Sequence, residues 1–169
     1  NAIFSIFFII MARSYETGQF SEYIIANTLY GLILSFSSLG MSQWYIREYQ
    51  EGEKGISVTT LFFKIQLLAG VTFYILNIFL SHLLYKESAI HTLSLFLGIN
   101  IVFDNLIHVF KTVNIISFQQ RQTFKILSIE AILKLTLGLF ILYSTPNIML
   151  VVAILLLLRL FTLSLFFRH

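Results

Sequence analysis

Ionisable side chains lie inside long apolar stretches of this chain, where a charged group is usually paired with an opposite charge or takes part in function. They are Asp104, His108, Glu130, Lys134 and Arg159. The carboxylates and the imidazole could exchange a proton or hold a sodium ion, because histidine titrates near neutral pH. The lysine and the arginine could hold an anion such as a phosphate. These residue types therefore predict ion binding or ion pairing inside a set of apolar helices.

Spacing and depth indicate that these groups share one interior. Four polar residues fall on one helical face at spacings of four, four and three, namely Asn100, Asp104, His108 and Lys111. Asp104, Lys134 and Arg159 also lie at about the same depth in three successive stretches. A charge at the centre of a membrane helix costs about 2.5–3.5 kcal/mol. We therefore expect these charges to face one another rather than lipid.

Two interpretations of this interior stay open. In the first, Asp104 pairs with Lys134 or Arg159, and Glu130 pairs with Lys134 one helical turn away. In the second, the same groups line a hydrated, cationic site for an anion. Two carboxylates and two cations cancel formally, so a positive site needs a further contributor. The candidates are His108, Lys64 and Lys111.

The composition favours a lipid bilayer as the surroundings of these helices. Of the 169 residues, 57% are hydrophobic and 11% are charged, about half the charged fraction of a soluble domain. This excludes an ordinary soluble enzyme and a disordered tail. The absence of cysteine excludes disulfide frameworks and cysteine metal sites. No nucleic-acid partner is expected, because the slight basic excess is typical of membrane loops.

The predicted fold is all-α, a single transmembrane helix bundle over residues 1–169. Membrane-crossing helices need about 20 mostly apolar residues. On that basis the predicted helices cover about 1–12 (truncated), 23–46, 56–84, 92–112, 126–143 and 148–167. Pro146 is the only proline and predicts a turn before the last helix.

Two of the predicted helices carry stripes of small and hydrogen-bonding residues. The stripe in 23–46 consists of Asn27, Gly31, Ser35, Ser38 and Ser42; that in 56–84 consists of Gln66, Gly70, Tyr74, Asn77 and Ser81. Such residues let membrane helices approach closely. We expect packing from both stripes, with some positions also available to a ligand.

The distribution of basic residues predicts the orientation. If the N-terminus is cytoplasmic, the inner connections hold Arg47, Lys54, Lys111, Arg121, Lys125 and Arg168, and the outer ones hold only Arg13 and Lys86. Lysine and arginine favour the cytoplasmic side. A multi-pass protein with a cytoplasmic N-terminus is therefore predicted.

No enzyme, metal or cofactor is predicted. The connections between the helices are too short for a catalytic domain, and no glycine-rich phosphate-binding motif occurs. The histidines, at positions 82, 91, 108 and 169, lack the spacing of three or four residues typical of metal ligands.

Residues 12–48 resemble the N-terminal region of bacterial polysaccharide flippases, the O-antigen repeat-unit translocases of the multidrug/oligosaccharidyl-lipid/polysaccharide superfamily. The motifs are Ala12-Arg13, Phe20-Ser21-Glu22-Tyr23, Leu39-Gly40 and Ile46-Arg47-Glu48, followed later by a basic connection over 111–125. The Leu-Gly-Pro turn of that family is replaced by Tyr15-Glu16-Thr17, and Ser21 stands where glycine is common.

The resemblance implies that the chain is the first, six-helix lobe of a two-lobed transporter in the bacterial inner membrane. Its substrate would be an undecaprenyl-pyrophosphate-linked oligosaccharide, and its other partners membrane lipids and polysaccharide-assembly proteins. Arg159 and Lys134 would hold the pyrophosphate, and Asn100 and Asn77 would bind sugars. The remaining polar groups, Asp104, His108 and Glu130, would couple an ion or form ion pairs.

Three other functions stay open on sequence alone. A multidrug or cation antiporter of the same superfamily would use Asp104 and Glu130 in an acidic cavity. An integral membrane polysaccharide polymerase would need a long outer loop elsewhere in the reading frame. A structural bundle without transport would pair its interior charges fully and exclude water.

Overall fold

The chain forms a helical bundle, seen here in a computed structural model that describes residues 2–51, 56–86, 88–144 and 147–168. All regular structure in these ranges is helical. The helices are α1 (Ala2–Ser14), α2 (Thr17–Ser37), α3 (Met41–Glu51), α4 (Ile56–Leu84), α5 (Ser88–Ile116), α6 (Gln120–Ser144) and α7 (Ile148–Arg168). The predicted all-α helical class is confirmed.

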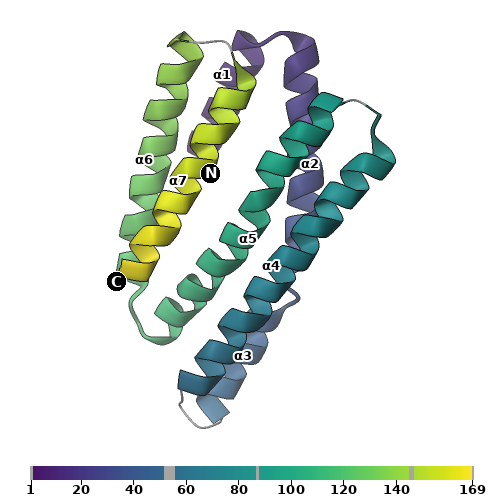
Figure 1. The fold of residues 1–169 in the computed structure, drawn as a ribbon. Helices are drawn as coiled ribbons and strands as arrows, with labels where there is room; N and C mark the ends of the chain where they lie inside the picture. Colours follow the sequence, from purple (N-terminus) through teal and green to yellow (C-terminus); the bar gives the residue numbers. More distant parts are fainter. Residues whose placement is uncertain (1, 52–55, 87, 145–146, 169) are drawn as a thin grey trace.

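α5 is the central helix, because α2, α3, α4, α6 and α7 all pack against it. Figure 1 shows two long antiparallel pairs, α4 with α5 and α6 with α7, with α2 running behind α5. The α1–α2 and α4–α5 connections lie at one end of the bundle, while α3 and the α5–α6 connection lie at the other (Figure 1). Successive long helices therefore cross the bundle in alternating directions.

The surface of the bundle is apolar along much of its length. Within the described residues, four stretches are long and apolar enough to cross a membrane: Thr17–Gln50, Ser57–Leu84, Ala89–Ile116 and Ile148–Arg168. Leu68, Phe79 and Leu83 on α4 are each more than 60% exposed. Large apolar side chains on the outside of long helices are suited to contact with acyl chains.

The prediction of one continuous helix over 23–46 is wrong. α2 ends at Ser37 and α3 begins at Met41, with Leu39 and Gly40 between them at φ values of 49° and 65°. Both residues adopt the left-handed backbone conformation, which ends an α-helix and which glycine accepts readily. The apolar run continues through this break, so hydropathy alone did not show it.

Three helices extend beyond the limits predicted for them, which were 23–46, 92–112 and 126–143. α2 starts at Thr17, α5 runs to Ile116 and α6 starts at Gln120. The reason is that hydropathy marks only the apolar part of a helix, whereas backbone hydrogen bonding continues into its polar ends. Lys54, Thr145 and Pro146, with the turn predicted there, lie outside the described residues, as does Asn1 of the predicted 1–12 helix.

The polar stripe of α4 packs against α5 and α2, as expected. Asn77 donates to the backbone oxygen of Ser94 at 2.9 Å, and Gln66 donates to that of Ser38 at 3.1 Å. A Cβ atom added at Gly98 would lie 2.6 Å from Nδ2 of Asn77 and 3.0 Å from Cδ2 of Tyr74. Glycine at this position therefore allows α4 and α5 to approach closely.

This contact predicts that Gly98→Ala lowers the free energy of unfolding. The added methyl group has no free space and must displace Asn77 or Tyr74, which costs about 1–3 kcal/mol. Unfolding of the detergent-solubilised chain, followed by circular dichroism, measures the change. Gly31→Ala is the matched control, since nothing lies within 4 Å of its added Cβ. Equal destabilisation by both variants would contradict the role assigned to Gly98.

Candidate functional site

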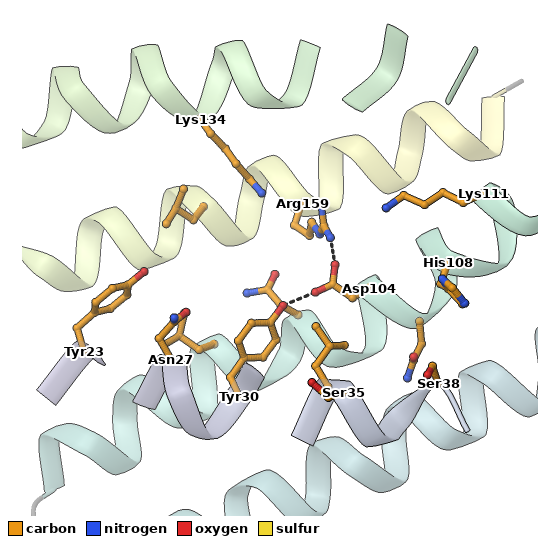
Figure 2. Close-up of a pocket in the computed structure, with 15 residues that line it drawn as sticks. Tyr23, Asn27, Tyr30, Ser35, Ser38, Asp104, His108, Lys111, Lys134 and Arg159 are labelled. Carbon is orange, nitrogen blue, oxygen red and sulfur yellow. Dashed lines mark hydrogen bonds and ion pairs between the residues drawn. The ribbon is translucent and has the colours of Figure 1, made fainter. Parts of the chain in front are cut away.

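A cavity of about 570 Å³ lies between α2, α5, α6 and α7. Figure 2 shows its charged and polar side chains converging from these four helices. Its lining consists of Tyr23, Asn27, Tyr30, Leu34 and Ser35 from α2 and Ser38 directly after it, Leu97, Asn100, Asp104, Asn105, His108 and Lys111 from α5, Lys134 from α6, and Leu155 and Arg159 from α7. The volume is within the range of small-molecule binding sites.

Arg159 joins two carboxylates at the wall of this cavity. Its guanidinium forms an ion pair with Asp104, and its Nη1 donates to Oε1 of Glu130 at 2.6 Å. The Nζ of Lys134 contacts the same Glu130 oxygen at 2.5 Å. The hydroxyl of Tyr30 donates to the second oxygen of Asp104. Four helices, α2, α5, α6 and α7, are thus joined by one network of charges.

The members of the network differ in their access to water. The side chain of Glu130 is 4% exposed and that of Asp104 is 8% exposed, whereas Lys134 is 26% exposed. The carboxylates are therefore largely enclosed, and the cationic groups reach into the cavity. Figure 2 shows the amino group of Lys134 directed into it from α6.

Lys111 gives the site its positive charge. It lines the cavity and, in the part of the chain that the structure describes, forms no ion pair. Figure 2 shows it extending from α5 towards Arg159. Lys111, Lys134 and Arg159 stand against Asp104 and Glu130, so three cations and two anions leave one positive charge in excess.

His108 links the cavity to α3. Its Nε2 atom is hydrogen-bonded to the hydroxyl of Ser42 on α3. Thr112, one turn further along α5, donates to the backbone oxygen of His108 at 2.9 Å. The imidazole is therefore held at the α3 side of the cavity, separate from the Asp104 and Arg159 pair.

Most of the predicted site residues come together. Asn100, Asp104, His108, Lys134 and Arg159 all line the cavity, and Glu130 lies behind its wall. The ion pairs of the first interpretation are formed, and the same groups lie beside a cavity.

Asn77 is the exception among the predicted ligand-binding residues. It is fully buried between α4 and α5 and hydrogen-bonded there. Its role is helix packing, because the α4 stripe faces α5 and does not reach the cavity.

Tyr30 and Tyr23 are lining residues that sequence reasoning missed. Tyr23, Asn27, Tyr30 and Leu34 follow at spacings of four, three and four, which is the period of one helical face. The polar stripe predicted in 23–46 included Asn27, but it was defined by small and amide residues and therefore left out the tyrosines. Their hydroxyl groups make them polar at the tip and apolar along the ring.

The site has unused hydrogen-bonding capacity. The side-chain oxygen of Asn100 is buried and has no hydrogen-bond partner within the described residues. A buried carbonyl of this kind is stabilised by a donor from water or from a ligand. Among the described residues no group of three or more histidine, cysteine, aspartate or glutamate side chains could hold a metal ion. The cavity therefore presents hydrogen-bonding groups together with the charged groups of Lys111, Lys134 and Arg159.

No family model matches the chain, and searches of curated proteins and of solved structures also find no match. The fold and the site define the chain as an apolar helical bundle with a cavity lined by charged residues.

The network predicts unequal effects of removing its two cations. Arg159→Met leaves Asp104 without its cation in an enclosed position, and breaking such a buried pair costs about 3–5 kcal/mol. Lys134→Met costs less, because Glu130 keeps Arg159 and because Lys134 is partly exposed. Unfolding in detergent by circular dichroism checks the order. Equal losses would contradict the central position of Arg159.

Proposed function

We propose that the chain is one lobe of a membrane carrier that moves an anionic, lipid-linked oligosaccharide across the bacterial inner membrane. The observation that carries the proposal is the excess of one formal positive charge in a cavity lined by α2, α5 and α7, which lie in stretches long and apolar enough to cross a membrane, and by α6. A diphosphate head group carries negative charge and would otherwise have to cross an apolar layer. The motif resemblance of residues 12–48 to polysaccharide flippases points to the same class of substrate.

The lining residues suit the two parts of such a ligand. Arg159 offers a planar fork of donors to phosphate oxygens, while Lys134 and Lys111 act as point charges. The buried oxygen of Asn100 and the hydroxyl of Ser35 are suited to the hydroxyl groups of sugars. In this proposal an incoming phosphate competes with Asp104 and Glu130 for Arg159 and Lys134. This competition lowers the affinity for the ligand and lets it be released.

The direction of transport follows from the charge of the substrate. A membrane potential that is negative inside favours outward movement of an anion by about 2.3 kcal/mol per charge for each 100 mV. The N-terminus is proposed to be cytoplasmic. In that orientation the exposed Arg47, Arg121 and Lys125 lie at the inner end of the bundle, the end that holds α3 in Figure 1. His108, which lines the cavity outside the Arg159 network, is the group proposed for coupling to an ion.

The alternative functions differ from this one in measurable ways. A cation antiporter needs an excess of negative charge, and this cavity has one net positive charge instead. A polymerase needs acid–base groups near an acceptor site, whereas both enclosed carboxylates are occupied by Arg159. Binding of a cationic dye in preference to a diphosphate would favour the antiporter.

Binding of a fluorescent polyprenyl diphosphate to the chain in lipid nanodiscs tests the proposal. Lys111→Gln and Lys134→Gln should each weaken binding by about 10–100-fold, because a hydrogen bond to a charged group contributes about 1.5–3 kcal/mol. Lys64→Gln is the matched control, since Lys64 is exposed on α4 outside the cavity. Equal affinities of all three variants and the parent chain would refute the cationic site.

Cysteine labelling tests whether the cavity contains water in a bilayer. The chain has no cysteine, so Ser35→Cys places a single thiol in the lining and Thr72→Cys places one on the exposed side of α4. The thiolate is the reactive form and requires water. A charged thiol reagent should therefore modify position 35 much faster than position 72. Equal, slow labelling at both positions would show a dry interior.

A further inference from the structure

Two histidines from neighbouring helices meet at the end of the bundle opposite α3. His82 lies in the last turn of α4, and His91 lies in the first turn of α5. Their ring centres are 4.2 Å apart and the ring planes are inclined at 59°. His82 is exposed, and His91 is half-buried. Neither residue lines the cavity, so this pair is a separate feature of the molecule.

A buried hydroxyl group orients one of the two rings. The Oγ atom of Ser81 lies 3.1 Å from Nδ1 of His91, and Ser81 is 1% exposed. When Nδ1 carries the proton and donates to Ser81, the lone pair on Nε2 is left available as a ligand. Metal-binding histidines almost always have their other ring nitrogen bonded in this way.

The distance between the rings suits two bonds to one metal ion. Metal–nitrogen bonds of about 2.0–2.1 Å to one nitrogen of each ring hold the ring centres roughly 4.5–5 Å apart. The observed rings need to separate by less than about 1 Å to reach this arrangement, and the exposed His82 is free to do so. The helices themselves are already fixed by the close contact at Gly98 and the hydrogen bond from Asn77 to Ser94.

We propose that His82 and His91 form a binding site for a divalent transition metal ion of the Cu²⁺ or Zn²⁺ type. Imidazole nitrogens suit these ions, and Cu²⁺ is bound more tightly than Zn²⁺ or Ni²⁺ by such ligands. Two protein ligands leave positions for water, so the site is open and exchangeable. A bound ion bridges α4 and α5 at the end where they are connected.

Metal titration of the complete chain tests this site. The chain, freed of any affinity tag and treated with chelator, is titrated in detergent with CuCl₂, NiCl₂ and ZnCl₂ by isothermal calorimetry. One equivalent of metal should bind, with Cu²⁺ the tightest of the three ions. The electron paramagnetic resonance spectrum of the Cu²⁺ form should show coupling to two imidazole nitrogens.

Variants separate this site from the other histidines. His82→Ala and His91→Ala should each weaken binding at least tenfold, and Ser81→Ala should weaken it about 10–100-fold through the loss of ring orientation. His108→Ala and His169→Ala are the controls and should bind like the parent chain. All variants are compared at equal helicity by circular dichroism. Undiminished binding by the His82→Ala/His91→Ala double variant, or loss of binding in His108→Ala, would overturn the proposal.

Discussion

The ion pair between Arg159 and Asp104 is the constraint on which the arrangement of the helices depends. A charge in an apolar bundle must find a counter-charge, and the partners of Arg159 come from two other helices, α5 and α6. The hydroxyl of Tyr30 completes the coordination of Asp104 from α2. The positions of α2, α5, α6 and α7 relative to one another are therefore constrained by these charged contacts, while apolar side chains pack in the remaining space. The same requirement keeps the carboxylates occupied and leaves Lys111 unpaired in the described part of the chain.

α5 lines the cavity with one face and packs against α4 with another. One face carries Asp104, His108 and Lys111 into the cavity. Another face carries Gly98, which allows α4 to approach until the Asn77 side chain reaches the backbone of α5. A close contact on one side holds α5 in place while its other side lines the cavity. The polar stripe of α4 therefore faces its neighbouring helices, and none of its residues lines the cavity.

The sequence predicted those features that depend on one helix at a time. Hydropathy located the apolar part of each long helix. Because Asp104, Lys134 and Arg159 lie at similar depths in their helices, the sequence also predicted that they share one interior. Contacts between helices were harder to predict, because spacing does not say which neighbour a stripe faces. Asn77 was assigned to the ligand for that reason. His82 and His91 were dismissed by their separation along the chain, although the α4–α5 connection returns one beside the other.

The break at Leu39 and Gly40 also limits the length of the helix in the apolar stretch over 17–50. At 1.5 Å per residue, a continuous helix of 34 residues would be about 51 Å long, far more than the ~30 Å hydrocarbon layer. The 21 residues of α2 alone span about 31 Å. Ending α2 there keeps its length close to that thickness, and α3, with Trp44 and Arg47, packs against α4 and α5 instead of continuing α2. The left-handed conformation of Leu39 and Gly40 thus gives α2 a length close to the thickness of the hydrocarbon layer.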